Sequence, residues 1–341
     1  MVLAGARNDR VKQLSTALHV DVTEDRLHDL LRVALARIRD CGSRVELRVV
    51  SRVCTDTSFP ILDCYLNFLK SHYGSELKSV DFKSQHEKIR LEVNSWVEQV
   101  TVFKIKDLLA EGGVDGSTVL SLVNAVYFKG LWETQFLTEL TGPCDFRVDL
   151  KTTIQVDMMH HEGDYRMSRS EKLKVRALEV PYQGRKASMV VLIPDDIEGL
   201  SYLEEHLSAD ALAELLQDLS VSSEIQLSLP KFKVEQSTNL EESLKALGVK
   251  DLFTSSADLS GISPKAELRV SKVVHKAFIE VDEKGTKAAA ATEASISCDC
   301  ACKDAEFVVD RSYMFLIRCH DPDLILFTGS VRRPKGVSHQ I

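Results

Sequence analysis

The stretch that decides the fold runs from Glu283 to Thr292 and reads Glu-Lys-Gly-Thr-Lys-Ala-Ala-Ala-Ala-Thr. Gly285 gives the start of this stretch unusual backbone freedom. The alanine run by itself favours a helix, because alanine has the highest helix propensity. The side chains nevertheless separate into two alternating sets, which is the period of a β-strand.

The two alternating sets differ in charge. The first is small or apolar throughout and consists of Thr286, Ala288, Ala290, Thr292, Ala294 and Ile296. The second carries both charges and consists of Lys287, Ala289, Ala291, Glu293, Ser295 and Ser297. A strand with one buried and one exposed face needs this separation, and small side chains enter a packed sheet without overpacking it. We therefore expect the segment to become an inserted β-strand.

The composition is that of a soluble globular protein. The 341 residues are 44% hydrophobic and 28% charged, which is ordinary for that class. No apolar run approaches the roughly 18–20 residues that span a bilayer. The formal net charge of −8 argues against nucleic acid or an anionic membrane as the partner. No cofactor motif is present, and we expect none.

The eight cysteines do not have the spacing of a compact disulfide framework. Three of them, Cys298, Cys300 and Cys302, alternate on the segment that follows the alanines. They are interpreted as exposed free thiols, with a soft-metal or redox module as the competing hypothesis. The first residues lack a basic region followed by an apolar one, so we expect no signal peptide in this chain.

Helical and strand patterns alternate along the whole chain. Apolar residues recur at helical spacing over 24–39 and 86–101. A helix over 201–217 starts with the capping-box pair Ser201 and Glu204, and Thr238 with Glu241 predicts another start, with a stop at Gly248. Strand patterns cover 45–49, 189–193 and 225–229. We predict an α+β fold in a single domain, residues 1–341.

Motifs of common enzymes are absent from the sequence. There is no G-x-S-x-G, P-loop, dinucleotide-binding or H-E-x-x-H pattern. Cysteine and histidine are both present, but no local signature supports a Cys–His nucleophile. The sequence therefore predicts that the protein is not an enzyme and holds no metal.

Several long motifs resemble the serpin superfamily of serine peptidase inhibitors, as does the 283–292 stretch. They are Leu122–Trp132, Leu229–Phe232, Ala257–Ile262, Val273–Phe278, Phe315–Ile317 and Leu326–Gly329. The resemblance covers residues 1–334. It implies helices packed around three β-sheets, with a hinge and exposed reactive loop over 283–306. Strand addition by loop insertion in serpins is itself a known example of this physics.

The resemblance also implies a mechanism. The loop binds a serine peptidase, and in some cases a cysteine peptidase, as a pseudo-substrate; an acyl-enzyme forms, and the cut loop enters the central sheet. The resemblance further implies a monomer that is secreted to the extracellular space. A non-inhibitory binding protein and an inactive short form are the alternative hypotheses. The start of the chain resembles the end of the family's second helix, so we expect the first helix and an early strand to be missing.

Individual positions match family residues. Glu283 and Lys231 match an ion pair at the top of the loop, and Trp132 is expected near them. Asn124 and His275 match a polar cluster where the central strands part. The matching hinge positions are Gly285, Thr286, Ala288, Ala289, Ala290, Ala291 and Thr292.

The position of the cut and one helix end remain open in the sequence. The family's spacing, counted from Gly285, implies a scissile bond between Asp299 and Cys300, whereas counting back from the C-terminal motifs gives Ala301, both within Cys298–Lys303. Val102-Phe103 stands where the family commonly has an Asn-Gly-like helix stop, and the missing glycine removes an easy left-handed residue.

Overall fold

The structure is a computed structural model that describes residues 1–20, 26–39, 45–283 and 306–334. The chain forms two compact units. The first comprises Met1–Asp40, Leu47–Phe128 and Val234–Ile279, and the second comprises Cys41–Glu46, Lys129–Lys233 and Glu280–Ile341.

The first unit is built around most of a five-stranded sheet in the order β2–β1–β3–β10–β9. The strands are β1 (Val45–Asp56), β2 (Glu76–Val80), β3 (Leu120–Gly130), β9 (Phe232–Asn239) and β10 (Lys272–Val281). The helices are α1 (Val2–Gly5), α2 (Asp9–Leu18), α3 (Leu27–Arg39), α4 (Asp63–Tyr73), α5 (Phe82–Val100), α8 (Glu241–Ala246) and the 3-10 helix η2 (Asp251–Phe253). The predicted helices at 24–39 and 86–101 are thus confirmed within the described residues.

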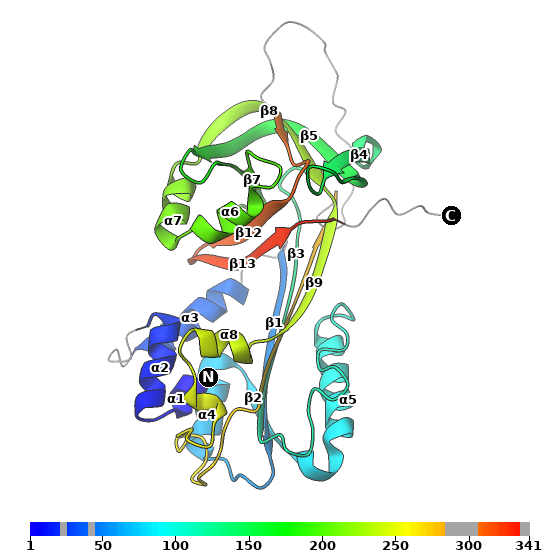
Figure 1. Ribbon diagram of the computed structural model, residues 1–341. Coiled ribbons are helices and arrows are strands. Elements are labelled where there is room, and N and C mark those ends of the chain that lie inside the picture. Colours follow the sequence, from blue (N-terminus) through cyan, green and yellow to red (C-terminus); the bar gives the residue numbers. More distant parts are fainter. Residues whose placement is uncertain (21–25, 40–44, 284–305, 335–341) are drawn as a thin grey trace, which may run out of the picture. The chain divides into compact units, whose positions relative to one another are not determined.

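Helices cover both faces of this sheet (Figure 1). On one face, Ile89, Val93 and Val97 of α5 pack with Val123 and Phe278 of the sheet. On the other, residues of α1, α2 and α4 join a second buried cluster that also takes in β1 and β3; it includes Ala6, Leu14, Val53, Leu69 and Leu120. Because side chains alternate along a strand, each central strand contributes to both clusters.

Helix α5 ends in a Schellman motif that has no glycine. The Phe103 N–H donates to the Glu98 carbonyl at 2.7 Å and the Val102 N–H donates to the Gln99 carbonyl at 3.3 Å, which is the paired pattern of this motif. Val102 and Phe103 have φ of 52° and 59°. The helix therefore ends at the pair where the sequence lacks the usual glycine, and both residues have positive φ.

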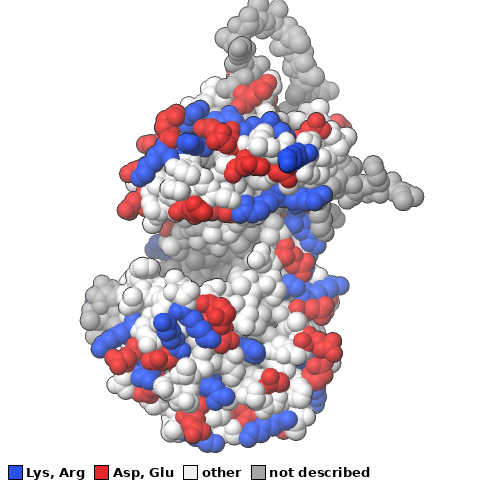
Figure 2. Space-filling view, viewed as in Figure 1, with Lys and Arg blue, Asp and Glu red and all other residues white. Residues whose placement is uncertain are grey.

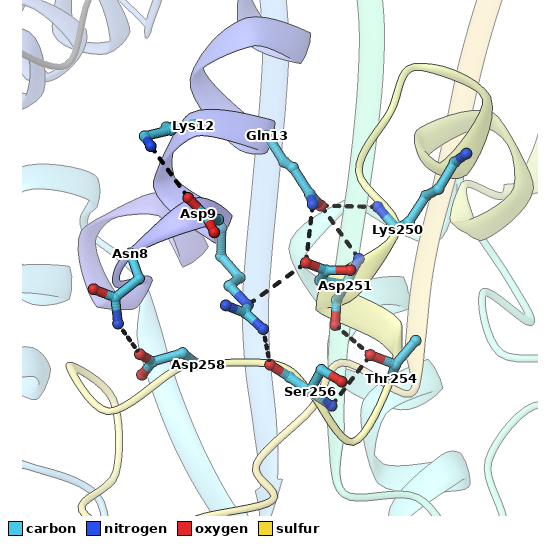
Figure 3. Close-up of polar contacts among 10 residues, drawn as sticks. Asn8, Asp9, Lys12, Gln13, Lys250, Asp251, Thr254, Ser256 and Asp258 are labelled. Atoms are coloured by element: carbon cyan, nitrogen blue, oxygen red, sulfur yellow. Dashed lines mark hydrogen bonds and ion pairs between the residues drawn. The ribbon is translucent and has the colours of Figure 1, made fainter.

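Helix α2 is joined to residues 250–258 by polar side chains (Figure 3). The Gln13 amide donates to Asp251 Oδ2 at 3.0 Å, and its oxygen accepts from the Lys250 and Asp251 backbone N–H groups. Asn8 Nδ2 donates to Asp258 Oδ2 at 2.6 Å. These contacts satisfy backbone donors of a loop that would otherwise depend on water.

The second unit contains an eight-stranded sheet, with the order β11–β8–β5–β6–β7–β12–β13 and β4 beside β5. The strands are β4 (Gly142–Arg147), β5 (Thr153–Ser170), β6 (Val175–Pro181), β7 (Ala187–Pro194), β8 (Ser220–Pro230), β11 (Glu306–Val308), β12 (Tyr313–His320) and β13 (Asp323–Val331). Its helices are α6 (Leu200–His206), α7 (Ala209–Gln217) and the 3-10 helix η1 (Thr138–Leu140). All residues of β7 are buried, as the apolar run at 189–193 predicted.

The long strand β5 explains why the described residues form two hydrogen-bonded sheets where the resemblance implied three. Its first part pairs with β4, its middle with β8, and its end with both β8 and β6. Hydrogen bonding along one strand therefore joins what would otherwise be two sheets. The α+β class and the strand pattern at 225–229, with Ile225, Leu227 and Leu229 buried, are confirmed.

Two predicted helix starts were wrong. The 201–217 segment breaks at Leu207 and Ser208, and the Ser208 hydroxyl accepts from the Ala211 N–H to start α7. Thr238 lies in β9, and Asn239 Oδ1 instead accepts from the Glu241 N–H at 3.2 Å. Local spacing is compatible with both caps, but α6 begins at Leu200 after Gly199, so Ser201 is not its cap, and Thr238 is part of a strand.

The surface carries charges of both signs. Figure 2 shows acidic and basic side chains interspersed over the face in view. The net charge of −8 is thus not collected there into one acidic patch. Within the part of the chain that the structure describes, no helix is long and apolar enough to cross a membrane.

Candidate functional site

Glu283, the first residue of the predicted hinge and reactive loop, lies within the described residues and is held at several atoms. Its carboxylate accepts from Lys231 Nζ at 3.0 Å, and its carbonyl accepts from the Phe136 N–H at 3.1 Å. The residue is 6% exposed. Burial works to raise the pKa of its carboxyl, but hydrogen bonds from backbone and from Lys231 outweigh burial and hold the pKa below its ordinary value.

The expected pairing of Glu283 with Lys231 is therefore present in the structure. The Lys231 side chain is 35% exposed and that of Glu283 is 8% exposed, so the pair is shielded on the carboxylate side. A pair of this kind differs from a surface ion pair, because removing one partner leaves a buried charge.

Trp132 fixes the residue before Glu283. Its indole N–H donates to the Asp282 carbonyl at 2.9 Å, and its ring stacks on Tyr182 with centroids 4.6 Å apart. Gly130 is required beside this stack, because a Cβ there would meet the Tyr182 ring at 2.5 Å. Trp132 thus lies next to the ion pair, as the sequence led us to expect.

Lys129 adds a second charge contact to the same segment. Its Nζ lies 3.5 Å from Asp282 Oδ2 and 3.9 Å from Glu280 Oε2. The sequence gave no signal for Lys129 or Tyr182, because their partners are more than 40 residues away along the chain. We call the group Lys129, Trp132, Tyr182, Lys231 and Glu283 the hinge anchor.

The first unit holds a separate polar cluster on its central strands. Asn124 of β3 and His275 of β10 are paired across the sheet, and His275 Nδ1 lies 2.7 Å from Asn124 Oδ1. Asn124 Nδ2 donates to the Ser51 hydroxyl at 2.8 Å and to the Val50 carbonyl at 3.1 Å. Burial lowers the pKa of His275, which favours the neutral ring.

Ser51 is the residue of this cluster that the sequence did not indicate. It lies on β1 and accepts from Asn124. The three polar residues, which we call the seam cluster, therefore connect β1, β3 and β10 across the sheet.

Several predicted positions lie outside the described residues. These are the hinge residues Gly285, Thr286, Ala288, Ala289, Ala290, Ala291 and Thr292, the scissile pair Asp299 and Cys300, and the thiols Cys298 and Cys302. Among the residues that are described, no group of three histidine, cysteine or acidic side chains is placed to hold a metal ion; this leaves the Cys298–Cys302 hypothesis untested.

The chain matches the family model described as Serpin (serine protease inhibitor) over residues 1–334. It is 50% identical to Iris of Ixodes ricinus over 334 residues, which cover 97% of this chain and 88% of Iris. It is 40% identical to the leukocyte elastase inhibitor of Sus scrofa over 339 residues, which cover 98% of this chain and 89% of that protein.

Solved structures of the same fold agree. Uncleaved ovalbumin superposes with a TM-score of 0.88 at 32% identity, covering 98% of this chain and 89% of ovalbumin. Serpin48 of Tenebrio molitor gives 0.87 at 29% identity, with coverage of 98% and 88%. The chain therefore belongs to the serpin family. This membership agrees with the prediction that the protein is an inhibitor-type protein and not an enzyme.

Proposed function

We propose that this chain inhibits serine peptidases as a suicide substrate. Residues 284–305 present the scissile bond Asp299–Cys300, an acyl-enzyme forms, and the cut hinge enters the five-stranded sheet between β3 and β10. The proposal includes a monomer of one domain, residues 1–341, that acts outside the cell. Family membership and a relative named leukocyte elastase inhibitor support it.

The observation that carries the proposal is the pairing of β3 with β10. These neighbours are parallel, and their register runs from Lys272 opposite Ser121 to Ile279 opposite Phe128. A segment that follows β10 and folds back beside it would be antiparallel to both strands. Insertion would replace one parallel ladder with two antiparallel ones, which are more stable per residue.

The energy available from this exchange is large. About a dozen inserted residues at roughly 1 kcal/mol net per backbone hydrogen bond give on the order of 10 kcal/mol. That equals the whole stability of a typical domain. It is enough to distort a peptidase that is attached through an acyl bond.

Both ends of the proposed loop are fixed. Glu283 belongs to the hinge anchor, and β11 pairs in parallel with β8, with Glu306 opposite Gln226. A peptidase that cuts between these two ends releases the Glu283 side from the β11 side. The freed hinge can then fold back along β10.

The seam cluster lies in the path of the inserted strand. Separating β3 from β10 breaks the hydrogen bond between Asn124 and His275, at a cost of about 1 kcal/mol. This cost is small beside the gain from insertion. The cluster would therefore keep the sheet closed before cleavage without preventing insertion afterwards.

A denaturing gel tests the proposal directly. We expect incubation with serine peptidases of acidic, basic and apolar preference to give a denaturant-resistant covalent band with at least one of them. Mass spectrometry of the released C-terminal fragment should place the cut at Asp299–Cys300. Loop cleavage without any covalent band, across this panel and a cysteine peptidase, would refute trapping and favour a non-inhibitory protein.

Two arginine substitutions provide a matched pair. Ala288 belongs to the uncharged alternating set and Ala289 to the set that already carries Lys287 and Glu293. Ala288→Arg should turn the inhibitor into a substrate that is cut without trapping, because a charge enters the sheet. Ala289→Arg should keep the covalent band. Equal loss in both variants would contradict the assignment of faces.

A further inference from the structure

The second unit brings together a cysteine, a histidine and a serine that the proposed function does not use. Cys144 Sγ lies 3.8 Å from His160 Nε2, and His160 Nδ1 lies 2.9 Å from Ser228 Oγ. The three residues come from the adjacent strands β4, β5 and β8. All three side chains are half-buried, so a small reagent can reach them from solvent.

Strand register places the three side chains on the same face of the sheet. Cys144 is opposite Val156, and His160 is opposite Ser228. Val156 and His160 are an even number of residues apart on β5, so all of these side chains lie on one face of the sheet. The contacts therefore depend on the backbone pairing of three strands rather than on a flexible loop.

The order of the three groups suits proton transfer from the thiol. When Nδ1–H of His160 donates to the Ser228 hydroxyl, the neutral ring has its free lone pair at Nε2, toward Cys144. An imidazole nitrogen held against a thiol is a common way to activate a cysteine nucleophile. Ser228 acts here as the group that orients the base.

We propose that Cys144 is an activated thiol that forms mixed disulfides with low-molecular-weight disulfides of the glutathione class. Cys144 Sγ attacks one sulfur of the reagent while its proton passes to His160 Nε2. The new S–S bond forms as the reagent's S–S bond breaks, and the departing thiolate takes the proton from His160. The reagent disulfide is the oxidant, so atoms and electrons balance.

Other described cysteines lack this combination of access and a nearby base. Cys54 is 1% exposed, and burial raises the pKa of its thiol to about 11. Cys319 is 0% exposed. Cys64 is exposed on α4 and is a suitable internal reference. The inference does not rest on peptidase inhibition.

The test is site-resolved reaction of the full chain with glutathione disulfide. Quenched samples are digested without reductant, and the tryptic peptide 130–147 contains Cys144 as its one cysteine. Peptide 53–70 contains both Cys54 and Cys64, and fragment ions assign its adduct to Cys64. His160→Gln keeps a polar side chain of similar size but removes the base. We expect it to slow adduct formation at Cys144 by about 10-fold or more and to leave Cys64 unchanged.

Ser228→Ala supplies a second variant that leaves the base in place. We expect a smaller loss at Cys144, because the ring keeps its nitrogen but loses its orienting partner. Thermal melting of both variants confirms folding. Unchanged Cys144 rates in both variants would overturn the proposal, and so would a loss that is equal at Cys144 and Cys64.

Discussion

The left-handed end of α5 gives a prediction whose sign can be worked out from the backbone. Val102 is at the position of the Schellman motif where glycine is usual, with φ of 52° and 46% of its surface exposed. A non-glycine residue in this conformation costs about 1–2 kcal/mol. Glycine avoids that cost but loses about 0.5–1 kcal/mol through its greater freedom in the unfolded chain.

The comparison of Val102→Gly with Val102→Ala isolates the backbone term, because both variants lose the valine packing. The glycine variant should have the higher free energy of unfolding, by about 0.5–1 kcal/mol. Ser95 is exposed inside α5 and provides the matched pair Ser95→Gly and Ser95→Ala. There the glycine variant should be less stable by about 1 kcal/mol.

Urea unfolding of the four variants measures both differences. The expected result is a change of sign between the two positions. If glycine destabilises relative to alanine at Val102 as it does at Ser95, residue 102 does not have left-handed angles in solution. The assignment of a strained helix stop would then be wrong.

The hinge anchor and the seam cluster give three further predictions. Lys231→Met should lower the free energy of unfolding by about 2–3 kcal/mol, because it leaves the Glu283 carboxylate buried without its cation. The double variant with Glu283→Gln should recover part of the lost free energy of unfolding. No recovery would argue against the ion pair. In the seam cluster, urea unfolding should show that Ser51→Ala lowers the free energy of unfolding by about 1 kcal/mol and Asn124→Ala by about 2–3 kcal/mol. Equal losses would contradict the assignment of Asn124 as the residue that binds both of the others. Burial lowers the pKa of His275, so the unfolded chain binds more protons than the folded chain as pH falls below about 6.5. Between pH 7 and pH 5, wild type should therefore lose more free energy of unfolding than His275→Gln. Parallel pH profiles of the two proteins would exclude this contribution.

Patterns that depend on neighbouring residues were predicted well. Two strands were predicted from local pattern and are present in the structure. One has alternating apolar residues at Ile225, Leu227 and Leu229, and the other is the apolar run at 189–193; in each, the pattern determines which faces are buried. Helix starts were predicted less accurately. The spacing at Ser201 and Thr238 is compatible with an N-terminal cap, but neither residue caps a helix in the structure. Thr238 lies in strand β9, and the last residue of that strand, Asn239, makes the contact to the Glu241 N–H instead.

Residues of the site that depend on sequence-distant partners could be found only partly. Glu283, Lys231, Trp132, Asn124 and His275 were assigned by resemblance to a family, and the structure places them in the hinge anchor and the seam cluster. Ser51, Tyr182 and Lys129 carry no local signal, because their roles arise from the order of strands in the sheet. Cys144 and His160 are 16 residues apart and lie on neighbouring strands, and only the folded structure shows that their side chains meet.

The most direct test of insertion is the melting temperature of the chain before and after a single cut within 284–305. A gain of about 10 kcal/mol, divided by an unfolding entropy of about 0.7 kcal/mol/K for a chain of this length, predicts a rise of about 14 °C. Mass spectrometry confirms the cut, and cut Ala288→Arg should show little of the rise. A cut wild-type chain that melts at or below the temperature of the intact chain would contradict insertion between β3 and β10.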